Sequence, residues 1–226
     1  MTPSPNLDDM LLAGASGLVG RALLAQLLAE RHGRVHALVR REVADLPLSP
    51  QLSRHLIDFA HPGALPPAKE LYIAIGTTIK VAGSNAAFRA ADFDAVVNVA
   101  RAARAAGVKR VAVVSALGAD ASSRVFYNRV KGEMEAQLAA LAFERLVIAR
   151  PSLLAGERGA LGQAPRLGER LALALLTPIG RLLPARLRPI EATVVARAMR
   201  KALRRAGPPI EIIESAALQS LDRNAE

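Results

Sequence analysis

Near its start, the chain runs from a short apolar stretch into three glycines, Gly14, Gly17 and Gly20, that are spaced three residues apart. A strongly helix-forming segment, residues 22–29, follows directly. This order constrains the fold more than any other feature, because glycine permits φ > 0 in a tight turn and lets a helix pack closely on a strand. We therefore predict that the chain opens with the first strand and helix of an α/β domain.

The same turn suits a phosphate ligand. Backbone without a Cβ can approach a phosphate closely, and the first amides of the helix, with its positive dipole end, would face that ligand. A second strand, Val35–Val39, arrives where a dinucleotide-binding unit requires it. The alternative is an ordinary glycine-rich turn of an α/β protein. The residues predicted to hold a dinucleotide are Gly14, Ala15, Ser16, Gly17, Leu18 and Val19.

Strand-like and helical segments alternate along the rest of the chain. The predicted strands lie in residues 35–39, 55–59, 70–78, 108–115, 145–149 and 209–213, and the predicted helices include 92–106 and 191–205. Such alternation predicts a doubly wound parallel sheet flanked by helices, with ligands outside the carboxyl ends of the strands.

Composition narrows the class of protein. A chain of 226 residues with 51% hydrophobic and 22% charged residues predicts one globular domain over 1–226. The absence of cysteine excludes disulfides and thiolate metal sites, and the four histidines form no metal-ligand pattern, so we expect no metal. The first nine residues lack a basic region followed by an apolar run, so we expect a cytoplasmic protein.

The formal charge of +10 raises the question of nucleic-acid binding. The basic residues are dispersed along helices and aromatic residues make up only 3%, so no basic block alternates with stacking side chains. We therefore expect no nucleic-acid partner, and we assign the charge to a solvated surface and a cofactor site.

The second predicted strand ends in Arg40 and Arg41. In dinucleotide-binding domains this strand end reaches the adenosine ribose, where an acidic residue selects NAD. Two guanidiniums instead favour the 2′-phosphate of NADP, to which each contact would contribute about 1.5–3 kcal/mol. The alternative is that both arginines are only solvated.

Three later strand ends supply further candidates for cofactor contacts. Asp58, followed by Phe59, could accept a hydrogen bond from the adenine amino group, or Asp58 could cap a surface helix. Residues 75–77, which are Ile75, Gly76 and Thr77, form a small-residue turn suited to the middle of the cofactor. Pro151 and Ser152 follow the sixth strand and either face the nicotinamide or form a plain turn.

Three residues could carry acid–base chemistry. Ser115 ends the fifth strand, at the edge where such a sheet binds its ligand. Tyr127 and Lys131 are four residues apart and therefore share one face of a helix. An ammonium beside a phenol lowers the pKa of the phenol, which could then exchange a proton with a carbonyl or alcohol while hydride moves to or from nicotinamide. The alternative is a packed tyrosine and a surface lysine.

These motifs resemble the atypical short-chain dehydrogenase/reductases, and within them the group around the Tat-interacting tumour-suppressor oxidoreductase and its bacterial relatives. The matching segments are residues 14–20, 74–78, 82–84, 87–88, 114–115, 118–119, 127, 130–135 and 148–151. The resemblance implies a Rossmann fold that binds NADP(H), with Ser115, Tyr127 and Lys131 as the acting residues. Such proteins often carry two serines where this chain has Ser115 and Ala116, so the serine role either belongs to Ser115 or is partly lost, and Ser122 and Ser123 lie nearby as substitutes.

The segment 151–190 is expected to form a small substrate-side region. Its apolar run, residues 171–176, is too short to span a bilayer and could be a lid, a membrane-facing patch or a subunit contact in a homodimer. The leading expectation is an NADP-dependent oxidoreductase acting on a small carbonyl or alcohol. The alternatives are a non-catalytic NADP(H)-binding redox sensor and, more weakly, an enzyme similar to nucleotide-sugar epimerases.

Overall fold

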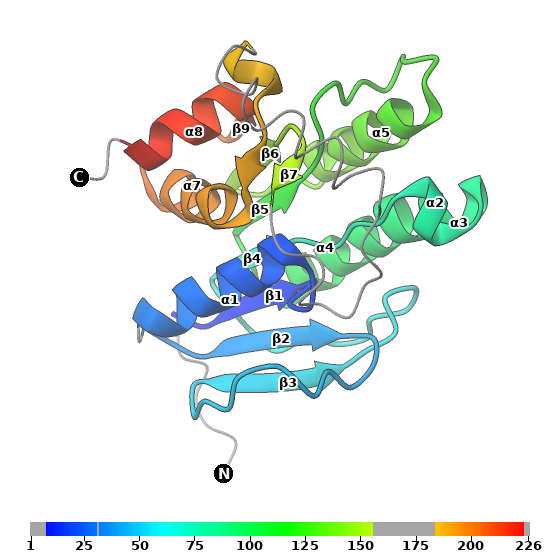
Figure 1. Ribbon diagram of the computed structural model, residues 1–226. Coiled ribbons are helices and arrows are strands. Elements are labelled where there is room, and N and C mark those ends of the chain that lie inside the picture. Colours follow the sequence, from blue (N-terminus) through cyan, green and yellow to red (C-terminus); the bar gives the residue numbers. More distant parts are fainter. Residues whose placement is uncertain (1–7, 31, 156–183, 224–226) are drawn as a thin grey trace.

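The computed structural model describes residues 8–30, 32–155 and 184–223, and its centre is a parallel sheet of seven strands (Figure 1). The strands are β1 (Met10–Ala13), β2 (Val35–Val39), β3 (Leu52–Leu56), β4 (Glu70–Ile73), β5 (Arg110–Val114), β6 (Arg145–Arg150) and β9 (Ile210–Glu214). Their order across the sheet is β3-β2-β1-β4-β5-β6-β9, and every neighbouring pair is parallel. The order reverses between β1 and β4, which is where such sheets bind their ligands.

The central strands are apolar because both faces of the sheet are covered. All four residues of β1 are buried, and Leu12 lies beside Ala37 of β2 and Tyr72 of β4 in the register of the sheet. The chain therefore reads as continuous hydrophobic runs at these strands, without the alternation that a half-exposed sheet would show.

Helices cover the two faces separately (Figure 1). One face carries α1 (Leu18–Glu30), α7 (Ala192–Arg204) and α8 (Ser215–Arg223), and the other carries α4 (Ala95–Ala105) and α5 (Phe126–Ala140). Each layer has its own hydrophobic core, so the sheet lies between two separate apolar clusters. The doubly wound parallel sheet expected from the sequence is therefore confirmed.

One helical run differs from its prediction in a way that affects the site. The helix expected over 92–106 is α4, and it is preceded without a break by α3 (Asn85–Arg89) and a π-helical segment, η1 (Ala90–Asp94). A π-helical segment contains one more residue than the α-helical turn it replaces, and such segments are frequent at functional sites. The short α2 (Ile79–Ala82) lies just before this run.

The third strand begins and ends earlier than expected. The sequence predicts this strand over residues 55–59, but in the structure β3 pairs with β2 from Val35 beside Leu52 to Val39 beside Leu56. Asp58 therefore lies beyond the strand, in a loop at the carboxyl edge of the sheet.

The C-terminal third adds a small second sheet, in which β7 (Leu154–Ala155) pairs with β8 (Ile190–Glu191) next to the 3₁₀ turn η3 (Ala185–Leu187). Of the expected substrate-side region, residues 156–183, with the apolar run 171–176, lie outside the described residues. Within the described ranges, no helix is long and apolar enough to cross a membrane.

Candidate functional site

The glycine turn between β1 and α1 is packed so closely that two of its glycines have no room for a side chain. Gly14 has φ of +95°, and a Cβ there would lie 2.5 Å from the carbonyl carbon of Ala74, after β4. A Cβ on Gly20 would lie 1.9 Å from the carbonyl oxygen of Gly14. At Gly17 the nearest atom would be 3.6 Å away, which is ordinary contact, and its amide donates to the Gly14 carbonyl at 3.0 Å. Gly14 and Gly20 thus bring strand, helix and the neighbouring loop together.

A cavity of about 330 Å³ opens beside this turn, at the carboxyl ends of the strands. Its wall consists of the start of α1, the loops that follow β4, β5 and β6, one side of α5, and single residues of α2 (Val81) and η1 (Asp92). The lining residues that the sequence singled out are Gly17, Leu18, Val19, Ile75, Gly76, Thr77, Ser115, Tyr127, Lys131, Pro151 and Ser152. Two predicted groups, the end of the glycine-rich turn and the Tyr-Lys helix, therefore meet at one cavity although they are more than a hundred residues apart.

Lys131 is buried at this cavity and forms an ion pair with a residue that sequence reasoning missed. Its Nζ lies 2.7 Å from Oδ1 of Asp92, and both side chains are almost fully buried. Oδ2 of Asp92 accepts a hydrogen bond from the amide of Thr77 at 2.8 Å. A buried ammonium is costly unless it is paired, and Asp92 supplies the opposite charge next to Lys131.

Tyr127 lines the cavity one helical turn before Lys131. Its ring packs against Phe88 of α3, with ring centroids 5.2 Å apart. Burial raises the pKa of the Tyr127 phenol above its ordinary value, Lys131 lowers that pKa, and Asp92 raises it again. The phenol is therefore protonated at neutral pH and can serve as a proton donor.

Ser115 lies at the cavity wall, but its hydroxyl is directed to a carboxylate. The hydroxyl donates to Oε1 of Glu135 at 2.5 Å. Glu135 also accepts two hydrogen bonds from Arg150, at 3.0 and 2.6 Å, and this pairing helps to raise the pKa of Arg150. Because the hydroxyl hydrogen of Ser115 is engaged in the hydrogen bond to Glu135, Ser115 offers only its oxygen lone pairs to a ligand in the cavity.

The other serines that could take this role are engaged elsewhere. The Ser122 hydroxyl donates to Asp120 at 2.8 Å, and the Ser123 hydroxyl accepts from the amide of Val125 at 3.1 Å. Neither contributes to the wall of the cavity. Ser152 does, but its hydroxyl is bonded to the Arg188 carbonyl and to Ser215.

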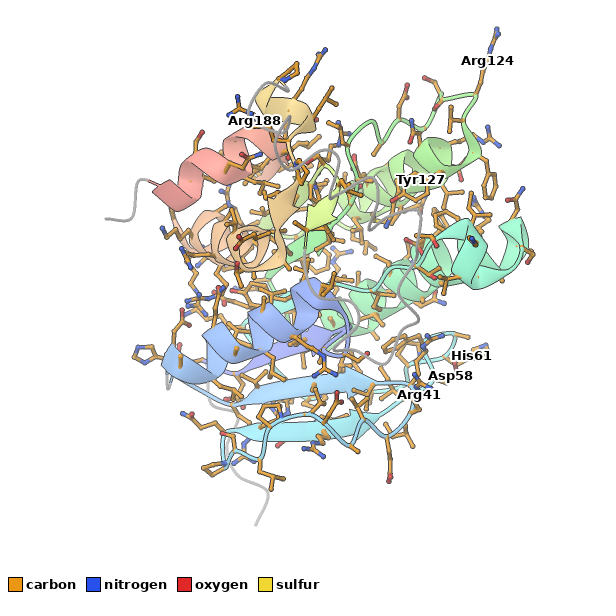
Figure 2. The ribbon with its side chains drawn as sticks, in the orientation of Figure 1. Arg41, Asp58, His61, Arg124, Tyr127 and Arg188 are labelled. Atoms are coloured by element: carbon orange, nitrogen blue, oxygen red, sulfur yellow. The ribbon has the colours of Figure 1, made fainter. Side chains whose placement is uncertain are left out.

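The residues predicted to hold the adenosine end lie apart from the cavity. Arg40 and Arg41 are exposed after β2, and Asp58 is exposed after β3; Figure 2 shows Arg41 and Asp58 close together in that view, on neighbouring loops. The Asp58 carboxylate accepts from the Ala60 amide at 2.9 Å, which is the main reason that its pKa is lowered. The Phe59 side chain is buried in the core. Ala15 is also buried, while Ser16 is exposed.

Asp92 and Glu135 are the site residues that the sequence reading missed. Asp92 belongs to the polar end of a predicted helix, where an acidic residue is ordinarily a solvated helix start. In the structure Asp92 lies in the π-helical segment η1, is buried, and pairs with Lys131. Glu135 is four residues after Lys131, on the same helix face, and this spacing was a usable signal for a role near the site.

Comparison with known proteins agrees with this geometry. Residues 14–152 match the family described as NAD(P)H-binding, and these residues contain both the glycine turn and the Tyr-Lys helix. The chain is 36% identical over 152 residues to Protein FMP52, mitochondrial, from Eremothecium gossypii, covering 66% of this chain and 68% of that protein. It is 33% identical over 170 residues to Protein HTATIP2 from Rattus norvegicus, covering 73% and 68%.

The chain belongs to the NAD(P)H-binding family of atypical short-chain dehydrogenase/reductases. Solved structures share the fold at low identity. A UDP-glucose 4-epimerase of Thermotoga maritima with UDP-glucose has a TM-score of 0.66 at 14% identity, over 95% of this chain and 80% of that chain. The Bordetella bronchiseptica enzyme WbmF in complex with NAD+ has a TM-score of 0.66 at 12% identity, over 97% and 78%.

The expectation of a cytoplasmic location is contradicted by these relatives. Several of them, from Eremothecium gossypii, Coccidioides immitis, Emericella nidulans and Aspergillus niger, are named mitochondrial proteins. The expectation rested on an N-terminal pattern that concerns secretory signals alone, and such a pattern does not assign a compartment.

The packing of the turn predicts a contrast between two glycine substitutions. We expect Gly20→Ala to lower the free energy of unfolding by about 1–3 kcal/mol, because its methyl group would collide with the Gly14 carbonyl. Position 17 has room for a methyl group, so Gly17→Ala should change the free energy of unfolding by less than about 0.5 kcal/mol. Urea unfolding of both variants measures the difference, and equal effects would show that the turn relaxes around Gly20.

Proposed function

We propose that this protein is an NADP(H)-dependent oxidoreductase that transfers hydride to or from a small carbonyl or alcohol. The observation that carries the proposal is the single cavity lined both by the glycine turn at the start of α1 and by Tyr127 and Lys131. The turn supplies backbone amides that can bind a pyrophosphate, and the phenol supplies a proton for the reacting oxygen of a substrate. The family relationship supports a nicotinamide cofactor of either kind.

The residues of the turn fit such a cofactor. Gly14 and Gly20 have no space for a Cβ, whereas Gly17 faces the cavity and leaves backbone exposed there. The first amides of α1 have no partner within the helix and can donate hydrogen bonds to an anion. When bound, the nicotinamide would donate or accept the hydride. The residues proposed to hold the cofactor are Gly14, Ala15, Ser16, Gly17, Leu18, Val19, Arg40, Arg41, Asp58, Phe59, Ile75, Gly76, Thr77, Lys131, Pro151 and Ser152.

Tyr127 is proposed as the proton donor to the substrate oxygen, because its phenol remains protonated at neutral pH and reaches the cavity. Lys131, held by Asp92, would bind a cofactor hydroxyl and supply positive charge near the phenol. Ser115 would accept a hydrogen bond from the hydroxyl of an alcohol substrate, since its own proton is bonded to Glu135.

The hydrogen bond from Ser115 to Glu135 also favours a second candidate function. In it, the protein binds NADP(H) without catalysis and reports redox state through protein contacts. Ser115 donates to Glu135, and Ala116, which also lines the cavity, has no hydroxyl. A carbonyl substrate would then have Tyr127 as its donor but no serine donor. Turnover with carbonyl substrates distinguishes the two candidates.

The preference for NADP is proposed to rest on Arg40 and Arg41. We expect the double variant Arg40→Ala/Arg41→Ala to bind NADPH about 10²–10⁴-fold more weakly, since it removes two charge-assisted contacts to a 2′-phosphate and each contributes about 1.5–3 kcal/mol. NADH binding should stay unchanged. Titration of NADPH and NADH fluorescence gives both dissociation constants.

The matched control is Arg101→Ala/Arg104→Ala, which removes the same charge from exposed positions on α4. It should leave the ratio of NADPH to NADH affinity unchanged. A wild-type protein that binds the two cofactors equally well, or binds neither, contradicts the proposed preference.

Catalysis is proposed to depend on the Tyr127 hydroxyl. Tyr127→Phe should reduce NADPH consumption with a panel of small aldehydes and ketones by about 10²–10⁴-fold, the usual contribution of a positioned proton donor, with NADPH affinity unchanged. The control is Tyr72→Phe, which removes the hydroxyl of the second tyrosine of the chain. Tyr72 is buried in β4 and donates to Glu70, so this variant should leave turnover unchanged. No turnover by the wild-type protein over the panel would favour the non-catalytic candidate.

A further inference from the structure

The segment α3–η1 approaches α5 with three side chains, and two of the three contacts involve the proposed catalytic pair. Phe88 packs on the ring of Tyr127, and four residues later Asp92 pairs with Lys131, which is itself four residues after Tyr127. Beside them, Arg89 pairs with Glu133 of α5 at 2.5 Å. The four-residue spacing of Phe88 and Asp92 therefore matches that of Tyr127 and Lys131. Both residues of the proposed catalytic pair are in contact with side chains from outside α5.

The same carboxylate also reaches the loop that follows β4. The Thr77 amide donates to Asp92 Oδ2 at 2.8 Å, while Oδ1 faces Lys131. A Cβ on Gly76 would lie 3.4 Å from Oδ1 and 4.0 Å from Nζ of Lys131, so the backbone of this loop lies directly over the ion pair. Asp92 thereby joins three parts of the cavity wall: η1, α5 and the loop at residues 75–77.

We propose that Asp92 is a positioning residue that holds the Lys131 ammonium at the cavity, ties the loop at residues 75–77 to it, and offsets the positive charge of Lys131 beside the Tyr127 phenol. The role of Asp92 in catalysis rests on the proposed function. The geometry of the ion pair does not depend on that function and can be tested in the protein without cofactor.

The offset has a defined sign. The charged groups that act on Tyr127 among the described residues are Lys131, from its own helix, and Asp92, from η1. The ammonium stabilises phenolate and lowers the pKa of the phenol, whereas the carboxylate destabilises phenolate and raises it. Removing only the charge of Asp92 should therefore lower the pKa of Tyr127, and removing only the charge of Lys131 should raise it.

The protein is suited to this measurement. It has two tyrosines and no tryptophan or cysteine, so phenolate absorbance has little interference. The second tyrosine, Tyr72, is fully buried and donates to Glu70, and burial raises its pKa far above the ordinary value. Tyr127 is therefore the phenol that ionises first, and Tyr127→Phe identifies its signal.

We expect Asp92→Asn to shift the phenolate titration of Tyr127 to lower pH by about one unit relative to the wild-type protein, the usual effect of one charge at close range. The matched control is Asp94→Asn, the same change at an exposed position of η1, and it should shift the titration by much less. A titration midpoint that is unchanged or higher in Asp92→Asn overturns the proposal.

A second pair of variants keeps the test decisive if Asp92→Asn does not fold. Lys131→Met should raise the midpoint, because the carboxylate is then uncompensated, and Asp92→Asn/Lys131→Met should return it toward the wild-type value. Equal midpoints for the single and double variants would show that Asp92 does not act on the phenol. Failure of wild-type protein to bind NADPH would instead contradict the proposed function and leave these midpoints interpretable.

Discussion

The close contact between β1, α1 and the loop after β4 is the constraint on which the rest of the structure depends. Gly14 and Gly20 allow this contact because neither position has space for a side chain, and Gly14 also takes a backbone conformation that favours glycine. Once α1 starts at that point, its first amides open on the cavity at the reversal of strand order. The cavity then receives the loops after β5 and β6 because all of these strands are parallel and end at the same edge.

The electrostatics of the cavity follow from which charges are paired within the protein. Lys131 is paired with Asp92, and Arg150 is paired with Glu135 and Glu214, so two cations at the carboxyl edge of the sheet are already compensated. The resulting site has little excess positive charge next to Tyr127, whose phenol stays protonated. The phenol at the cavity is therefore in its proton-donating form.

Much of the fold could be predicted from the sequence because its signals are local. The glycine spacing and the apolar runs located β1, β2, β4, β5, β6 and β9, and the parallel order followed from their alternation with helices. The limits of β3 were wrong by three residues, because pairing with β2 decides where that strand begins. The π-helical segment was missed because a one-residue insertion in a helix leaves no clear periodic signal.

The site was predictable where function depends on residues that are close in sequence. Tyr127 and Lys131 share a helix face, and the structure brings both to the cavity with the start of α1. Asp92 could not be identified, because its contacts with Lys131 and Thr77 arise only when three separate segments pack together. The orientation of the Ser115 hydroxyl toward Glu135 likewise depends on side-chain packing between β5 and α5, which spacing alone does not specify.

A crystal structure of the protein with NADP+ tests the central claim most directly, namely that one cavity serves both the glycine turn and the phenol. The account predicts the pyrophosphate at the first amides of α1, and the nicotinamide in the cavity beside Tyr127 and Lys131. A nicotinamide that lies outside this cavity, or a pyrophosphate bound away from the glycine turn, would contradict it.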